Sequence, residues 1–175
     1  MDAAACPWNE NNKLVRIALE GKEIIREERP ASNVVFLLDV SGSMNRANKL
    51  PLLKKSLKYL LEEMSEEDTI SIVVYAGASG LVLPATKVDD AGRVMITKAM
   101  EKLSAGGSTA GGAGIKLAYK IAQENFIKGG VNRVILATDG DFNVGVSDPD
   151  ELTDLVKERA GKGVDISVLG FGTGN

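Results

Sequence analysis

The chain has 175 residues, of which 44% are hydrophobic and 26% charged, a balance typical of one globular domain with its own core. Its net charge of −3 argues against a nucleic-acid-binding surface, which needs a basic stripe. The sequence contains no histidine and one cysteine, so zinc sites, Ser-His-Asp triads, Cys-His dyads and an internal disulfide are excluded within it. Any chemistry must therefore be carried by oxygen atoms and lysines. No apolar run approaches the length of a membrane span.

The beginning of the chain differs in pattern from the rest. Residues 1–29 are predicted to form an N-terminal extension, and residues 30–175 the main domain. Polar and apolar residues alternate fairly well over residues 13–20, and Gly21-Lys22 can turn the chain into a second extended piece. The extension is therefore predicted to be an edge hairpin or a strand from a neighbouring module.

In the main domain, predicted strands alternate with predicted helices. Apolar runs rich in β-branched residues indicate buried strands, and apolar residues spaced by three or four positions indicate helices. In chain order we expect strand 34–40, helix 49–64, strand 69–76, a short antiparallel edge strand 81–84 ending at a proline, helices 90–103 and 113–126, strand 132–138, helix 149–160 and strand 164–169. This alternation predicts an α/β, Rossmann-like fold, with a mostly parallel sheet, one antiparallel edge strand and helices on both faces.

Side chains that carry oxygen follow two of these strands. Asp39, Ser41 and Ser43 come directly after the first strand of the main domain, and Asp139 follows strand 132–138. Thr109 lies in a glycine-rich loop just before a predicted helix. Ligands of α/β sheets bind beyond the carboxyl ends of the strands, so we expect the three segments to meet at one rim. Carboxylates and hydroxyls are hard ligands, of the type that Mg²⁺, Mn²⁺ or Ca²⁺ prefers.

Two simpler interpretations of these motifs stay open from the residues alone. The Ser-Gly-Ser sequence after the strand could be only a turn, with Asp39 as its cap. The loop 106–114 could bind phosphate through its backbone amides, although it follows a helix and lacks a Walker lysine.

Together, Asp39-Val40-Ser41-Gly42-Ser43, Thr109 within Gly-Ser-Thr-Ala, and Asp139 within Ala-Thr-Asp-Gly resemble the metal-ion-dependent adhesion site (MIDAS) of von Willebrand factor A (VWA) domains. The resemblance covers about residues 32–175. The residues that surround these motifs are most similar to those of bacterial cell-envelope VWA proteins. It implies a metal site formed by Asp39, Ser41, Ser43, Thr109 and Asp139. It also implies that the family's final helix and strand are missing from this sequence.

The resemblance implies a function as a metal-dependent protein-binding, or adhesion, module rather than an enzyme. Hydroxyls and at most two carboxylates would leave the cation short of negative charge, so that an Asp or Glu carboxylate of a partner protein completes its coordination. From the resemblance we expect a bacterial envelope or extracytoplasmic location, with a soluble fragment, no nucleic-acid partner and no membrane insertion. We also expect the apolar edge of strand 164–169 to be covered by residues 13–25 or by self-association.

Two alternative functions stay open. The first is a metal-dependent phosphotransferase or hydrolase on a Rossmann-like fold, although such enzymes usually carry a second carboxylate where this chain has Ser41. The second is a structural scaffold whose site holds no metal in the cell.

Overall fold

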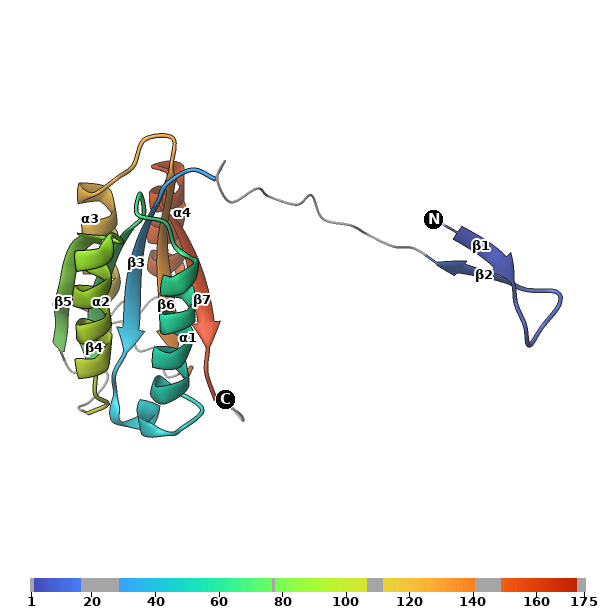
Figure 1. Ribbon diagram of the computed structural model, residues 1–175, viewed down its shortest axis with the longest axis horizontal. Helices are drawn as coiled ribbons and strands as arrows, with labels where there is room; N and C mark the ends of the chain where they lie inside the picture. Colours follow the sequence, from blue (N-terminus) through green and yellow to red (C-terminus); the bar gives the residue numbers. More distant parts are fainter. Residues whose placement is uncertain (1, 17–28, 77, 107–111, 141–148, 173–175) are drawn as a thin grey trace.

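The main domain is built on a five-stranded sheet. The computed structural model describes residues 2–16, 29–76, 78–106, 112–140 and 149–172. The strand order is β5-β4-β3-β6-β7, in which only β5 is antiparallel to its neighbour (Figure 1). The strands of this sheet are β3 (Ser32–Asp39), β4 (Thr69–Ala76), β5 (Ala78–Lys87), β6 (Val131–Thr138) and β7 (Asp165–Gly170). The predicted α/β class, with one antiparallel edge strand, is confirmed.

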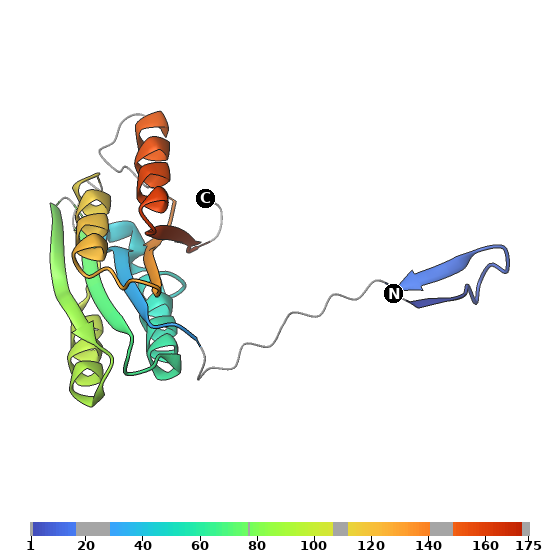
Figure 2. The ribbon, with the colours of Figure 1, turned by 90° about the horizontal axis from the view of Figure 1, so that it is seen from above.

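Helices cover both faces of the sheet (Figure 2). They are α1 (Leu50–Glu63), α2 (Asp90–Lys102), α3 (Gly112–Glu124) and α4 (Pro149–Gly161). Helices α1 and α2 pack with alternate residues of β3 and β4 into one apolar core, and α3 and α4 pack on the other face. Helix α1 follows its predicted period, since its buried residues are Leu50, Leu53, Leu57 and Leu61. Leu60, which the period places on the same face, is exposed instead.

The antiparallel edge strand is longer than predicted. Strand β5 runs for 10 residues and continues through Pro84 rather than ending there. Its pairing with β4 shifts register between Ile70 and Ile72 and again between Ile72 and Val73. Such irregularities accommodate a residue that has no N–H to donate, and an edge strand needs hydrogen bonds on one side only. The proline therefore marks a bulge in β5 and not its end.

The N-terminal hairpin also differs from the prediction. Strand β2 (Lys13–Arg16) pairs antiparallel with β1 (Asp2–Ala5), which the sequence analysis did not find. The connection is closed by hydrogen bonds from the Cys6 N–H to the Asn12 carbonyl and from the Asn12 N–H to the Asn9 carbonyl. The predicted turn at Gly21-Lys22 lies outside the described residues. Within the described residues, these two strands form a sheet of their own and do not extend the edge of the main sheet.

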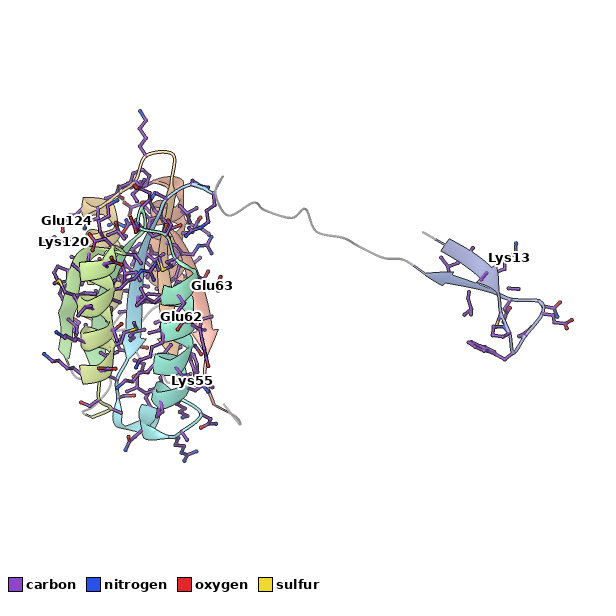
Figure 3. The ribbon with its side chains drawn as sticks, in the orientation of Figure 1. Lys13, Lys55, Glu62, Glu63, Lys120 and Glu124 are labelled. Atoms are coloured by element: carbon purple, nitrogen blue, oxygen red, sulfur yellow. The ribbon has the colours of Figure 1, made fainter. Side chains whose placement is uncertain are left out.

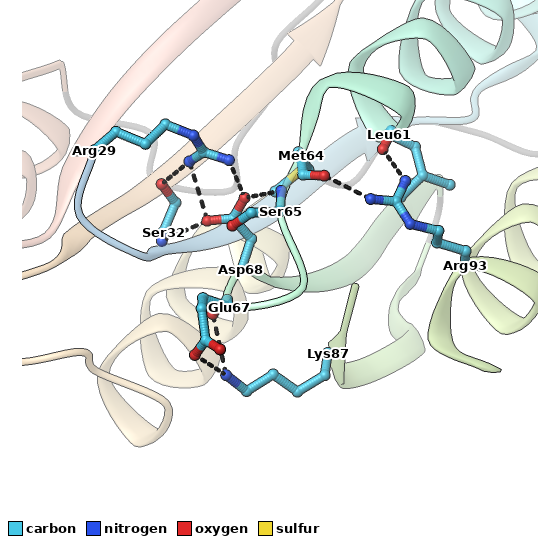
Figure 4. A network of polar contacts seen from close by, with 9 residues as sticks. All are labelled: Arg29, Ser32, Leu61, Met64, Ser65, Glu67, Asp68, Lys87 and Arg93. Carbon is cyan, nitrogen blue, oxygen red and sulfur yellow. Dashed lines mark hydrogen bonds and ion pairs between the residues drawn. The ribbon is translucent and has the colours of Figure 1, made fainter. Parts of the chain in front are cut away.

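A buried carboxylate, Asp68, organises the end of the sheet where β3 begins (Figure 4). It accepts hydrogen bonds from the Arg29 guanidinium, from the Ser32 N–H at 2.8 Å and from the Ser65 N–H at 2.8 Å. Burial alone would raise the pKa of Asp68, but these hydrogen bonds and the charge of Arg29 lower it below its ordinary value of 3.8. Asp68 thus joins the entry into β3 to the connection between α1 and β4.

At the other edge of the sheet, β7 presents apolar side chains to solvent. Val168 is 60% exposed and Leu169 43% exposed, and within the described residues β7 pairs with β6 alone. We expect this 175-residue chain to self-associate through the edge as concentration rises, because unpaired strand groups template pairing with a second copy. Light scattering after size-exclusion chromatography measures this self-association. Val168→Lys should weaken the association, whereas Val94→Lys on α2 should not. A monodisperse unmodified monomer would contradict the expectation.

Candidate metal centre

The candidate ligands lie where the strand order reverses. From the central strand β3, the chain passes to β4 on one side and later to β6 on the other. Asp39 is the last residue of β3, and Asp139 directly follows β6, which pairs with β3 in parallel. The carboxyl ends of adjacent parallel strands with diverging connections form the usual ligand site of open α/β sheets. The two aspartates therefore lie at the same rim of the sheet, where the sequence predicts them.

A tight turn after β3 brings the serine hydroxyls together. One Asp39 carboxylate oxygen accepts the Ser41 N–H at 2.8 Å, which fixes the backbone of the turn. The chain then enters a short 3₁₀ helix, η2 (Gly42–Asn45), and the Oγ atoms of Ser41 and Ser43 lie 3.0 Å apart. Asp39 and Ser41 are buried, whereas Ser43 is exposed. The two hydroxyls thus extend from the buried Ser41 to the exposed Ser43 at the surface.

The spacing of the two hydroxyls fits a small divalent cation. Two oxygen ligands at right angles, each about 2.1 Å from Mg²⁺, lie about 3.0 Å apart. The 3.0 Å between the Oγ atoms of Ser41 and Ser43 matches one edge of such an octahedron. The donors are hydroxyls and carboxylates, which hard cations prefer. Within the described residues no group of three or more His, Cys, Asp or Glu side chains is placed to hold a metal, so hydroxyls are a necessary part of this donor set.

Asp139 is buried and has a cationic partner. The Lys49 Nζ lies 2.7 Å from one Asp139 carboxylate oxygen, and the side chains are 9% and 3% exposed. After Asp139 the backbone turns at Gly140, whose φ of 104° favours glycine. The Gly140 N–H donates to the Thr138 hydroxyl at 3.2 Å, and that hydroxyl lies 3.5 Å from the second Asp39 oxygen. The Thr138 hydroxyl therefore links the turn after Asp139 to the Asp39 carboxylate.

Thr109 lies outside the described residues, so its predicted role stays a prediction. The described residues on either side of the Thr109 loop lie at the same rim. The Gly106 N–H donates to the Val40 carbonyl at 2.8 Å. On the other side, Gly114 packs so closely that an added Cβ would lie 3.2 Å from side-chain atoms of both Leu37 and Tyr75. The described residues Gly106 and Gly114, before and after that loop, thus lie near the carboxyl ends of β3 and β4.

Sequence reasoning missed two residues of this site. Tyr75 is buried and pairs in register with Asp39 across β3 and β4, and burial together with the nearby Asp39 charge raises its pKa. Its position at the end of the neighbouring strand was a usable signal. Lys49 had no such signal, because its contact with Asp139 spans 90 positions of sequence.

Comparison with known proteins shows the family. A model described as the von Willebrand factor type A domain matches residues 34–141, more than half of the chain. The chain belongs to the VWA domain family. It is 47% identical over 174 residues to the uncharacterized protein YfbK of Escherichia coli (strain K12), covering 99% of the chain and 30% of that protein. It is 32% identical over 146 residues to human inter-alpha-trypsin inhibitor heavy chain H3, covering 80% of the chain and 16% of that protein.

Solved structures agree with this assignment. BatB from Bacteroides thetaiotaomicron, described as a conserved hypothetical protein, is 26% identical to the chain, with a TM-score of 0.65 over 80% of the chain and 66% of BatB. A von Willebrand factor type A protein from Catenulispora acidiphila shares the fold, with a TM-score of 0.67 at 20% identity over 81% of the chain and 33% of that protein. VWA domains typically serve in protein interaction or adhesion. The VWA domain described here spans less than a third of the two curated relatives named above. None of its described helices has the length and apolar character to cross a bilayer.

Proposed function

We propose that this VWA domain is a metal-dependent protein-binding module in which Mg²⁺, or in its place Mn²⁺ or Ca²⁺, recruits an Asp or Glu carboxylate of a partner protein. The observation that carries the proposal is the 3.0 Å separation of the Ser41 and Ser43 hydroxyls beside the buried Asp39. Neutral hydroxyls do not offset the charge of the cation, so an external carboxylate is a favoured additional ligand. The proposed metal ligands are Asp39, Ser41, Ser43, Thr109 and Asp139.

The surface beside the site supports an acidic partner. A groove of about 640 Å³ begins at Asn45 in η2 and reaches Ser104 and Ala105, next to the loop that carries Thr109. Three lysines of α1 line it, namely Lys54, Lys55 and Lys58, together with one acidic residue, Glu101, which pairs with Lys58. Along α1, Lys55 lies toward the candidate metal site, whereas Glu62 and Glu63 lie toward the opposite end (Figure 3). The positive end of the helix surface therefore faces the partner that would bring the carboxylate.

Titration of the chain with Mg²⁺ or Mn²⁺ in a calorimeter tests the metal site. We expect saturable binding of one ion, a rise in melting temperature on binding and reversal by EDTA. Ser43→Ala should weaken the binding by about tenfold or more, since it removes one of the two hydroxyls. Ser56→Ala, which removes an exposed hydroxyl on α1, is the matched control and should bind normally. No binding at millimolar metal would contradict the proposal.

A second measurement tests the recruitment of a carboxylate. With the chain loaded with Mn²⁺, acetate should displace metal-bound water, and the relaxation enhancement of solvent protons should fall. An enhancement that acetate leaves unchanged would contradict carboxylate recruitment, and so would binding of a partner protein retained in excess EDTA. Turnover of a phosphate ester that is lost in Asp39→Asn would favour the hydrolase alternative instead.

The proposal includes a place in the bacterial cell envelope, supported only by the resemblance of the sequence to envelope members of the family. Fractionation of cells that produce the full-length protein tests this part separately. Recovery with the cytoplasmic fraction would contradict it without affecting the metal site.

A further inference from the structure

The buried ion pair between Lys49 and Asp139 adds a cation to the described part of the rim, and the metal-site proposal uses its carboxylate but not its ammonium. The ammonium lies 2.7 Å from the carboxylate, and both side chains are almost completely buried. Taking two charges out of water carries a desolvation penalty that can exceed the gain from their mutual attraction. Such a pair is therefore weak support for stability and calls for another explanation.

The position of Lys49 in its helix is also unfavourable. Lys49 is the N-cap residue of α1, where Ser, Thr, Asp and Asn are preferred, and it makes no side-chain cap hydrogen bond. A positive charge at a helix N-terminus opposes the helix dipole. The backbone is nevertheless fixed on both sides, since the Lys49 N–H donates to Arg46 and its carbonyl accepts from Leu53, each at 2.9 Å. Residues that break a local rule without a local gain are concentrated at functional sites.

We propose that Lys49 is a positioning residue that sets the charge of the metal site. Its ammonium neutralises Asp139, so a divalent cation beside Asp39 and Asp139 keeps one unit of positive charge, which an external carboxylate then neutralises. Without Lys49 the positive charge at the site would be smaller by one unit. The lysine thus weakens the hold on the metal and strengthens the demand for a partner carboxylate. This inference rests on the proposed function, because it assigns the charge balance of the same site.

Lys49→Met tests the inference, since it removes the charge and keeps an unbranched side chain. One charge close to a site changes affinity by about tenfold or more. We expect Mn²⁺, measured by calorimetry, to bind at least about tenfold more tightly to the variant than to the unmodified chain. Acetate, measured by solvent relaxation on the Mn²⁺-loaded variant, should bind at least about tenfold more weakly. Unchanged values for both constants would overturn the inference, even if the variant is less stable.

Two controls separate charge from packing. Lys49→Arg keeps the charge and should retain both affinities within about threefold. Lys120→Met removes an equivalent charge from the surface of α3, where Lys120 pairs with Glu124 at 3.8 Å and both side chains are more than half exposed. It should leave both constants unchanged, because exposed pairs are screened by solvent. Loss of carboxylate binding in Lys120→Met equal to that in Lys49→Met would overturn the special role of Lys49.

Lys49→Gln keeps the test valid if Lys49→Met does not fold. It removes the same charge but keeps an N–H donor for the Asp139 carboxylate. Acetate affinity should again fall by at least about tenfold, and an unchanged value would overturn the inference. Failure of the unmodified chain to bind Mn²⁺ would contradict the proposed function itself. Normal Mn²⁺ binding with no effect of these variants would contradict only the role of Lys49.

Discussion

In a chain with Asp39→Ala, Mg²⁺ and Mn²⁺ affinity is expected to fall by at least about a hundredfold, while the fold persists. The substitution removes the carboxylate that holds the Ser41 N–H at 2.8 Å, and with it a negative charge beside the cation. Both the geometry of the turn and the electrostatic attraction are lost together. Calorimetric titration gives the affinity, and the far-ultraviolet circular dichroism spectrum checks the fold.

Two further variants sharpen this prediction. Asp39→Asn keeps the shape of the side chain and an acceptor for the Ser41 N–H, so it isolates the charge and should still lose at least about tenfold in metal affinity. Asp165→Asn removes a carboxylate that is 59% exposed at the other end of the sheet, where β7 begins, and should bind metal normally. Normal metal affinity in Asp39→Ala would show that Asp39 is only a turn residue.

In Asp68→Ala, the free energy of unfolding at pH 7 is expected to fall by about 3–5 kcal/mol, because the change leaves the Arg29 guanidinium and two backbone N–H groups without their acceptor. Denaturation by urea measures the loss. Glu67→Ala is the matched control: Glu67 is adjacent, but its pair with Lys87 is 3.6 Å long and exposed, so little change is expected. Equal losses in the two variants would contradict the assigned role of Asp68.

The contribution of Asp68 should also depend on pH. Its pKa is lower in the folded chain than the ordinary value of 3.8, so the carboxylate stabilises the fold above the unfolded-state pKa. This stabilisation is lost as the pH falls below about 4 and through the folded-state pKa. The difference in unfolding free energy between the unmodified chain and Asp68→Ala should therefore narrow when urea denaturation is repeated at pH 3. A difference that is constant from pH 7 to pH 3 would contradict an ionic contribution.

The elements with a strong period could be predicted from the sequence. The strand predicted at residues 69–76 is β4, with the same bounds, because a run of β-branched residues buried on both faces has few other interpretations. Helix α1 begins and ends within one residue of its prediction. The predicted length of β5 was wrong because a proline such as Pro84 can mark either the end of a strand or a bulge within it. Only the pairing of β5 with β4 distinguishes these two cases.

The candidate site could be predicted only in part. Asp39, Ser41 and Ser43 are close in sequence, so a single turn brings them together, and Asp139 follows from the rule that parallel strands end at one rim. The role of Thr109 as a metal ligand remains a prediction. The Lys49 contact with Asp139 depends on the side-by-side placement of β3 and β6 and on the path of the loop before α1, neither of which leaves a local pattern.

The central position of β3 has a mechanical consequence. The segment that enters at Ser32 is attached there through Asp68, and a partner at Ser41 and Ser43 would bind at the opposite end of the same strand. A pull between the two would run along β3, across the hydrogen bonds to β4 and β6 on its two sides. These bonds would share the load in shear rather than open one after another, so a pull along β3 should meet more resistance than one that peels a strand from the edge of the sheet.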